Sequence, residues 1–265
     1  MPRQVTAFSN TTVKRLRSLR EKKHRRAEGL FLAEGLRILM EARDSGRLPE
    51  IVAFSPEGAR HPLAAQLIEA TEAAGGDAIE TTADILSKMS GKDNPQMLLG
   101  AYRQPETSVD RIDRSKAPLW IVAQALRDPG NIGTILRTGD AVGAGGLILV
   151  DDSADPFSVE AVRASMGAIF TQGVATARWE EFIGWLRSGE GQLVGTSLKA
   201  RQDYLDAEYS RPCFLLIGNE QQGLPPDYEA ECDLLVKIPM SGRADSLNAA
   251  MAAAVMAFAI KASWR

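Results

Sequence analysis

The sequence contains few residues that could form a metal site or a nucleophile. Its 265 residues include only two cysteines and two histidines. Cys213 and Cys232 form no Cys-x-x-Cys pair, which disfavours both a disulfide framework and a zinc ribbon. His24 lies in a basic run and His61 precedes a proline, so neither a Ser/His/Asp triad nor a histidine metal site is indicated. We therefore expect no bound metal and a chemistry that needs no histidine.

Long apolar runs are also missing. The longest nearly apolar run, Leu247 to Ile260, has 14 residues. This is shorter than the roughly 20 residues that cross a bilayer, so we expect a buried helix and no membrane partner. The N-terminus is basic and lacks the apolar stretch of a secretory signal, which predicts a cytoplasmic protein. With 45% hydrophobic and 25% charged residues, the chain is expected to form one large or two modest globular domains.

Positive charge is concentrated at the N-terminus. Residues 1–26 hold nine Lys or Arg and one acid, Glu21, which gives this stretch a charge of +8 in a chain whose net charge is −3. A solvated helix face would explain some of these cations, but so one-sided a stretch favours an anionic partner, and a nucleic-acid backbone is the obvious candidate. The residues expected to bind RNA are Lys14, Arg15, Arg17, Arg20, Lys22, Lys23, Arg25 and Arg26.

Two regions differ in their pattern of hydrophobic residues. The first predicts strands at 30–33, 51–54 and 97–102 and helices at 11–21, 34–44 and 62–73. The second has short apolar runs typical of buried parallel strands at 119–123, 147–150, 173–177, 193–196, 214–217 and 234–238, and helical patterns at 132–142, 159–168, 179–186 and 247–261. Both regions are therefore of the α/β class. We predict a small α/β domain over 1–103 that includes the basic arm, a polar linker over 104–118, and a parallel-sheet domain over 119–265.

The common nucleotide-binding motifs are not found. The run Gly143-Ala-Gly145-Gly146 lacks the third glycine of G-x-G-x-x-G, and Gly91-Lys92 is not followed by Ser or Thr. This disfavours a nucleotide-dependent oxidoreductase and a P-loop NTPase.

Three loops lie beyond the carboxyl ends of predicted strands, where parallel α/β sheets commonly bind ligands. In the first, Asn131 is expected to cap a helix on which Arg137 lies nearly two turns later. In the second, Gly218 allows the backbone to approach a ligand closely. In the third, Ser246 is expected to cap an alanine-rich helix. Each loop by itself is also explained by an ordinary turn or cap, and for the third loop alone plain capping is the better explanation.

Taken together, the three loops resemble the SpoU, or TrmH-like, branch of the SPOUT superfamily of RNA methyltransferases. The matching motifs are Asn131-x-Gly-x-x-x-Arg137, Gly218-Asn-Glu-x-x-Gly-Leu224 and Ile238-Pro-Met240 followed by Ser246-Leu-Asn248. The segment Arg163-Ala-Ser-Met-Gly-Ala168 is similar to the family's segment between the first two motifs.

The resemblance implies a homodimer whose C-terminal domain, 119–265, is tied into a trefoil knot and transfers a methyl group from S-adenosyl-L-methionine to an RNA ribose 2′-hydroxyl. It implies that the cofactor is held by Thr196, Gly218, Asn219, Ile238, Met240 and Leu247. The catalytic residues that it implies are Asn131, Arg137, Glu220, Ser246 and Asn248. The family proposal makes Arg137 the base, helped by Ser246. Since a guanidinium normally stays protonated, we expect Arg137 to position ribose and phosphate and to carry the proton only if desolvation lowers its pKa.

The first domain is similar to the RNA-substrate-binding domain attached to many of these enzymes, on the run Gly29-Leu-Phe-Leu-Ala-Glu-Gly-Leu-Arg37. Such a domain favours large-subunit ribosomal RNA (rRNA) over transfer RNA (tRNA) as the substrate. The alternatives are a tRNA 2′-O-methyltransferase and a catalytically silent RNA-binding or ribosome-assembly factor. Methyl transfer to RNA distinguishes the enzyme from the silent factor, and mapping of the methylated nucleotide distinguishes the two RNAs.

Overall fold

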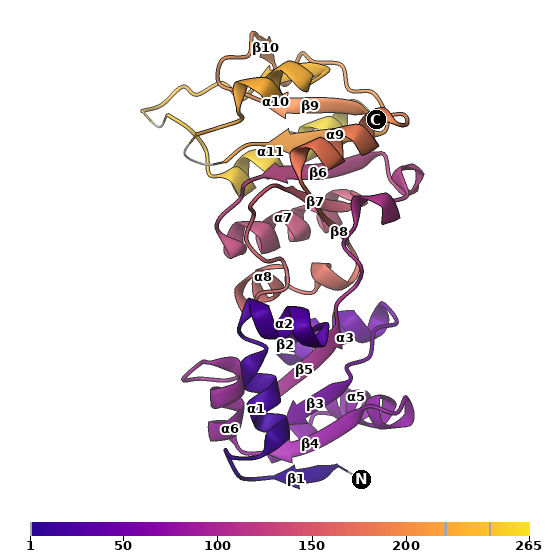
Figure 1. Cartoon of the computed structure of the whole chain (residues 1–265), viewed down its shortest axis with the longest axis vertical. Coiled ribbons are helices and arrows are strands. Elements are labelled where there is room, and N and C mark those ends of the chain that lie inside the picture. The colour runs from indigo at the N-terminus through magenta and orange to yellow at the C-terminus, as the bar shows by residue number, and fades with distance from the viewer. Residues whose placement is uncertain (1, 220–221, 244) are drawn as a thin grey trace. The chain divides into compact units, whose positions relative to one another are not determined.

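The chain forms two compact units. The computed structural model describes residues 2–219, 222–243 and 245–265. Unit 1 consists of Met1–Pro105 together with Asp155–Thr171, and unit 2 consists of Glu106–Ala154 together with Gln172–Arg265. Figure 1 labels most of the helices and strands of both units. No helix in the described part of the chain is long and apolar enough to cross a membrane.

Unit 1 is built on a five-stranded mixed sheet. The strands are β1 (Arg3–Val5), β2 (Leu30–Glu34), β3 (Ile51–Phe54), β4 (Asp77–Thr81) and β5 (Leu98–Arg103). Their order is β1-β4-β3-β5-β2, with β1, β4 and β3 parallel and β5 antiparallel to both of its neighbours. Six helices of the first 105 residues accompany the sheet: α1 (Thr11–Ser18), α2 (Lys22–Glu28), α3 (Leu36–Asp44), α4 (Pro56–Ala59), α5 (Pro62–Ala73) and α6 (Ala83–Ser90).

Helices α1 and α6 share one apolar core with the sheet. Val13 and Leu16 of α1 are buried with Leu86 and Met89 of α6. Helix α1 begins where the side chain of Asn10 accepts a hydrogen bond from the Thr12 amide, which satisfies one of the free N–H groups at a helix start. The exposed faces of both helices therefore carry the polar residues, because their apolar stripes are used in the core.

Residues 155–171 belong to unit 1 although they lie between two strands of unit 2. They contain helix α8 (Val159–Ala164) and the 3-10 helix η3 (Ala168–Phe170). Two bonds of an ion pair anchor the segment: the guanidinium of Arg25 donates to Oδ2 of Asp155 at 2.6 and 3.0 Å. Phe157 and Phe170 pack on Phe31, with ring centroids 5.2 and 5.7 Å apart. The predicted domain over 119–265 is thus interrupted by a segment that packs with the N-terminal region.

Unit 2 is built on a seven-stranded sheet in which all neighbouring strands are parallel. Its strands are β6 (Leu119–Gln124), β7 (Gly146–Val150), β8 (Gly173–Ala177), β9 (Gln192–Thr196), β10 (Gln202–Asp203), β11 (Cys213–Ile217) and β12 (Leu234–Lys237). The order is β10-β12-β9-β11-β6-β7-β8. The helices of this unit are α7 (Pro129–Val142), α9 (Trp179–Arg187), α10 (Pro226–Glu231) and α11 (Ala249–Ser263).

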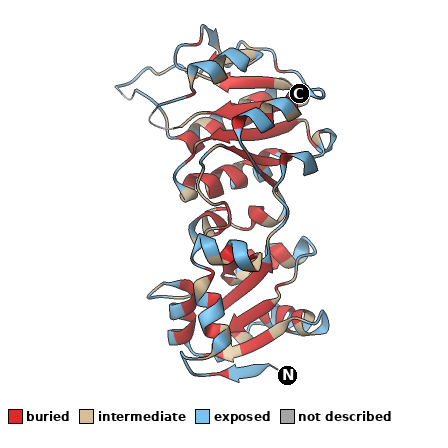
Figure 2. Cartoon of the chain, in the orientation of Figure 1, coloured by how far each residue is buried: buried red, intermediate tan, exposed pale blue. Residues whose placement is uncertain are grey.

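Helices cover both faces of the central strands of this sheet. Side chains alternate along a strand, and one alternating set, which includes Val122 and Leu216, packs against Phe182 and Leu186 of α9. Helices α7 and α11 pack on each other; α7 also packs on β6 and β7, and α11 packs on β6 and β11. This double coverage explains why the strands are continuous apolar runs, and Figure 2 shows the central strands as buried.

The polar stretch predicted as a linker is folded onto unit 2 from residue 106 onward. It contains the 3-10 helices η1 (Val109–Arg111) and η2 (Arg114–Lys116). The guanidinium of Arg114 donates to the carbonyl oxygens of Trp185, Leu186 and Glu190 and lies 4.1 Å from the centre of a Trp185 ring. Arg114 therefore attaches this stretch to the C-terminal end of α9.

We expect the Asp155→Ala substitution to destabilise unit 1. It leaves Arg25, which is only 3% exposed, without its counter-ion, and breaking a buried pair in this way lowers the free energy of unfolding by about 3 kcal/mol. Urea unfolding followed by circular dichroism measures the loss. Tryptophan fluorescence reports unit 2, which holds all four tryptophans, so its transition is expected to shift less. The control, Glu50→Ala, breaks a largely exposed pair with Arg103 and is expected to change stability by less than about 1 kcal/mol.

Candidate active site

A cavity of about 330 Å³ lies in unit 2. It is lined by residues at and beyond the carboxyl ends of β9, β11 and β12. All six residues expected to hold the cofactor line it: Thr196, Gly218, Asn219, Ile238, Met240 and Leu247. Ser246 of the third motif lines it as well, and so do two acidic residues, Glu229 and Asp245. The structure therefore brings the second and third motifs to one site, in accordance with the position of ligands in parallel α/β sheets.

The loop of the second motif is closed tightly. A side-chain carbon on Gly218 would stand 2.5 Å from the carbonyl carbon of Gly223 and 2.6 Å from the nitrogen of Leu224, so only glycine fits there. The Gly223 amide donates to the carbonyl of Asn219 at 2.9 Å. The side-chain amide of Asn219 donates in turn to the carbonyl of Ala125, at 2.9 Å, and this ties the loop to the end of β6. The backbone itself therefore forms one wall of the cavity.

A hydrogen bond joins the first motif to the third. Nδ2 of Asn248 donates to Oδ1 of Asn131 at 3.1 Å. Oδ1 of Asn248 accepts from the amides of Ala250 and Met251, at 2.9 and 3.3 Å, and so caps α11. Because capping occupies the oxygen, the amide nitrogen of Asn248 has to face Asn131. Two side chains that are 117 positions apart in the sequence are thereby held together.

Two of the predicted helix caps are wrong. Helix α7 begins at Pro129 and is capped by Asp128, whose Oδ1 accepts from the Gly130 amide at 2.8 Å. Proline favours the first position of a helix, so the helix starts before Asn131, whose side chain is used in the contact with Asn248. Helix α11 is capped by Asn248 and not by Ser246, which leaves the Ser246 side chain in the lining of the cavity.

The remaining two expected catalytic residues lie elsewhere or cannot be placed. Arg137 is exposed on α7 and is not among the residues that line the cavity. Glu220 lies outside the described residues. The structure thus joins Asn131 to Asn248 and places Ser246 beside the expected cofactor residues, while Arg137 projects from the surface of this unit.

Asp151 organises a polar cluster that the sequence analysis did not identify. It follows β7 directly and has a φ of 62°. Its carboxylate accepts from the hydroxyl of Tyr228 at 2.9 Å and from the amide of Trp179 at 3.0 Å. The rings of Trp179 and Tyr228 are stacked, with centroids 3.8 Å apart. Burial and the bond to Asp151 raise the pKa of Tyr228, so this hydroxyl stays protonated and acts as a donor. The only feature of the sequence that indicated this cluster is the position of Asp151, an acid directly after a predicted buried strand.

The basic arm is mostly exposed, with one exception. Arg25 is 3% exposed, pairs with Asp155 and donates to the carbonyl oxygens of Leu19 and Arg20. A side chain held in this way cannot reach a phosphate, which corrects the expectation that Arg25 binds RNA. The other seven cations are exposed: Lys14, Arg15, Arg17, Arg20, Lys22, Lys23 and Arg26.

Comparison with known proteins identifies the family. The model of the SpoU rRNA Methylase family matches residues 118–258, and the model of the MRM3-like substrate binding domain matches residues 10–100. The chain belongs to the SpoU rRNA methylase family. Both resemblances and the α/β fold inferred from the sequence are thus confirmed.

Relatives of this SpoU-family protein span nearly its whole length. It is 31% identical to the 23S rRNA (uridine(2479)-2'-O)-methyltransferase of Streptomyces viridochromogenes, over 87% of this chain and 82% of the relative. It is 27% identical to the 23S rRNA (guanosine(2553)-2'-O)-methyltransferase RlmP of Bacillus subtilis, over 98% and 99%. It is 39% identical to the AdoMet-bound rRNA methyltransferase from Sinorhizobium meliloti, whose structure superposes with a TM-score of 0.92 over 99% of this chain and 98% of that one.

The two thiols of the SpoU-family chain are poor nucleophiles. Burial raises the pKa of Cys213 to about 12 and is also the main cause that raises the pKa of Cys232 to about 12. A thiol with such a pKa is protonated at neutral pH, and the thiolate is the reactive form. Among the described residues, no group of three or more His, Cys, Asp or Glu side chains is placed to hold a metal ion.

We expect Asn248→Ala to destabilise unit 2 by about 1 kcal/mol, because it removes the cap of α11 together with the bond to Asn131. Asn248→Ser restores a capping oxygen but not the amide donor, and we expect it to recover most of the stability. Urea unfolding followed by tryptophan fluorescence measures both variants. Equal stability of the alanine variant and the wild type would contradict the structural role of this cap.

Proposed function

We propose that the protein transfers a methyl group from S-adenosylmethionine to a ribose 2′-hydroxyl of large-subunit rRNA. The observation that carries this proposal is the single cavity lined by the second and third motifs, to which the bond between Asn248 and Asn131 joins the first motif. The names of the full-length relatives agree with it, since both act on a 2′-oxygen of 23S rRNA.

The cavity suits the cofactor in size and in charge. Its volume, about 330 Å³, is within the range of small-molecule sites. Backbone at Gly218, Ile238 and Leu247 offers close approach and apolar surface to an adenosine. The lining holds two acids, Glu229 and Asp245, and one cation, Lys199, and its net negative charge attracts the positive charges of the sulfonium and the ammonium. When bound, the cofactor supplies a methyl group that its sulfonium already activates.

The chain's own residues then have to align the 2′-oxygen and assist the loss of its proton. Arg137 is the residue that we propose to hold the ribose and phosphate of the target nucleotide, since it is exposed and carries a permanent charge. Asn131 and Asn248 orient the nucleotide through amides that their mutual bond fixes. Ser246, which lines the cavity, assists at the 2′-hydroxyl, and Glu220 completes the proposed set.

The domain composition favours rRNA over tRNA. The two relatives named as 23S rRNA enzymes extend over both units of this chain, and the N-terminal region matches a substrate-binding domain. We place the enzyme in the cytoplasm, where it meets this RNA. Mapping of 2′-O-methylation across rRNA and tRNA, in cells with and without the protein, identifies the target. If cells without the protein lose a 2′-O-methyl group in tRNA alone, the proposed rRNA substrate is wrong and the proposed enzyme class still holds.

We expect Arg137→Ala to abolish methyl transfer to 23S rRNA and to leave the affinity for S-adenosylmethionine within a fewfold of the wild type, because Arg137 does not line the cavity. Incorporation of a radiolabelled methyl group and calorimetry on the same preparation measure the two properties. The matched control is Arg201→Ala, which removes an exposed arginine of the same unit that is also outside the cavity lining. Substantial turnover by the Arg137 variant would remove this residue from the mechanism.

We further propose that the enzyme is a homodimer. Met251, Val255 and Phe258 lie four and three positions apart, on one face of α11, and are 54%, 36% and 56% exposed. The opposite face, which includes Ala253 and Ile260, is fully buried. Three large apolar side chains in a row on an exposed helix face are typical of an interface.

We expect Phe258→Glu to convert a dimer into a monomer at micromolar concentration, because it places a charge in the proposed interface. Light scattering measures the mass. Leu205→Glu, which charges another large apolar residue that is 70% exposed, is the control and is expected to remain dimeric. A monomeric wild type in an active preparation would contradict the proposed assembly.

A further inference from the structure

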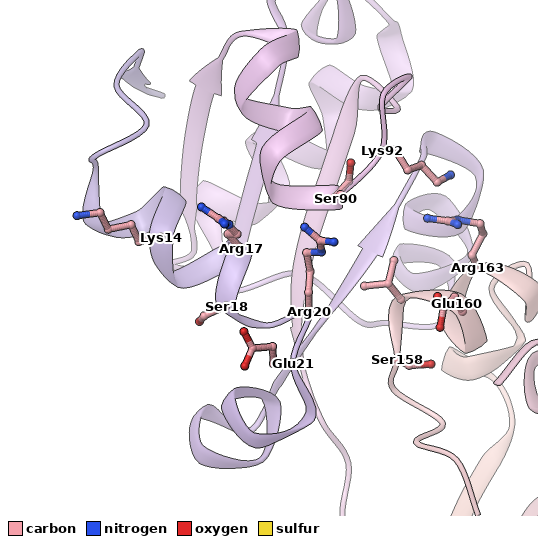
Figure 3. Close-up of a pocket in the computed structure, with 12 residues that line it drawn as sticks. Lys14, Arg17, Ser18, Arg20, Glu21, Ser90, Lys92, Ser158, Glu160 and Arg163 are labelled. Atoms are coloured by element: carbon pink, nitrogen blue, oxygen red, sulfur yellow. The ribbon is translucent and has the colours of Figure 1, made fainter. Parts of the chain in front are cut away.

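Unit 1 contains a hollow of about 630 Å³ that none of the three methyltransferase motifs lines (Figure 3). Three separate segments surround it. They are residues 14–21 at the end of α1 and the turn after it, residues 90–92 at the end of α6, and residues 158–163 of α8 and its cap. The lining contains five cations, Lys14, Arg17, Arg20, Lys92 and Arg163, and two acids, Glu21 and Glu160.

The three cations from the first segment are available to a ligand. Lys14, Arg17 and Arg20 form no ion pair with any other residue in the described part of the chain. Glu21 is engaged by Lys23 at 3.2 Å, and the pKa of Glu21 is lowered mainly by the hydrogen bond with Lys23 and by its charge. The charge of Arg17 contributes to this lowering as well, so Glu21 offsets part of the positive charge beside it, and the lining keeps more cations than acids.

A buried carboxylate holds the two other cations. Glu34, whose side chain is 4% exposed, lies 3.4 Å from Nζ of Lys92 and 3.3 Å from a terminal nitrogen of Arg163, and it also accepts from the Gln96 amide. One negative charge thus orients two positive ones, and the net positive charge remains at the hollow. Figure 3 shows Lys92 and Arg163 close to each other, and Arg20 of another segment of the lining apart from them.

The guanidinium of Arg20 lies against Gly91. This glycine ends α6 with a φ of +75°, and a side-chain carbon there would overlap the guanidinium of Arg20. The arginine therefore rests on bare backbone at the edge of the hollow.

We propose that this hollow binds a phosphodiester segment of the substrate RNA, with Lys92 and Arg163 as phosphate ligands beside Arg17 and Arg20. The inference rests on the proposed function only in that the substrate is an RNA. It assigns RNA binding to two cations outside the basic arm, one of them in the segment between the first two methyltransferase motifs. It also leaves four arm cations, Arg15, Lys22, Lys23 and Arg26, out of this site.

The composition of the lining favours the RNA backbone over the bases. No aromatic side chain lines the hollow, so the stacking surfaces that proteins use for unpaired bases are not found there. Three hydroxyls lie among the cations. Those of Ser18 and Ser90 donate to the carbonyls of Arg15 and Ser87, whereas that of Ser158 only accepts, from the Ala161 amide, and keeps its proton for a ligand. Hydroxyls and guanidinium groups are the usual donors to phosphate and sugar oxygens, which position an RNA without reading its sequence.

Two substitutions that change the charge of the hollow in opposite directions test the proposal. Lys92→Gln removes a cation, and we expect it to weaken binding of transcribed 23S rRNA by about three- to tenfold and to reduce the slope of log affinity against log salt by about 0.7 to 0.9. Glu160→Gln removes an exposed acid of the lining, and we expect about twofold tighter binding. The controls are Lys88→Gln and Glu69→Gln, which remove exposed charges of unit 1 outside the hollow and are expected to change nothing.

The outcomes separate this inference from the proposed function. If it holds, Lys92→Gln raises KM for 23S rRNA and leaves kcat at saturating RNA unchanged, with the circular-dichroism spectrum of the wild type. If the wild type methylates 23S rRNA and both variants bind it as their controls do, the inference is overturned and the enzyme class stands. If the wild type transfers no methyl group, the proposed function fails while the binding measurements still test the hollow. Binding of tripolyphosphate is measured with the same variants. If Lys92→Gln and Glu160→Gln change the affinity for tripolyphosphate but not for 23S rRNA, the hollow is a small-anion site and the RNA assignment is overturned.

Discussion

The side-chain amide of Asn248 links the beginnings of two helices of unit 2. Its oxygen starts helix α11, and its nitrogen holds Asn131 at the beginning of α7. Helices α7 and α11 pack on each other and on the strands that lead into the site, so the two motifs cannot move apart without loss of both the cap and the packing. The residues just before Asn248, Ser246 and Leu247, enter the cavity as a consequence. One neutral amide thus couples the start of two helices to the geometry of the site.

Residues 155–171 belong to the methyltransferase part of the sequence but pack within unit 1. The buried pair between Arg25 and Asp155 anchors this segment at its first residue, and Phe157 and Phe170 pack on Phe31 of β2. This arrangement brings Arg163, which belongs to a segment typical of the methyltransferase family, beside the buried Glu34. The segment between β7 and β8 therefore contributes charge to the surface that we propose for RNA.

The regular apolar patterns predicted the fold well, and the exceptions have physical reasons. The six apolar runs of the second region are strands β6, β7, β8, β9, β11 and β12, because a sheet covered on both faces requires continuous apolar segments. Helix α2 was not predicted, since Lys22–Glu28 is almost entirely charged and shows no apolar stripe. The caps of α7 and α11 were misplaced because several neighbouring residues can cap a helix, and the choice depends on which side chain a distant partner engages.

The sequence by itself determined the family, the parallel α/β sheet and the residues that meet at the cavity, because motif order and strand spacing are local properties of the chain. Only the tertiary structure decided the role of individual charges. Arg25 and Arg20 are both arginines of the same basic run, yet one is buried against Asp155 and the other rests on Gly91 at an open hollow. The sequence cannot distinguish them, since their partners lie 130 and 71 positions away and come near only when the chain folds.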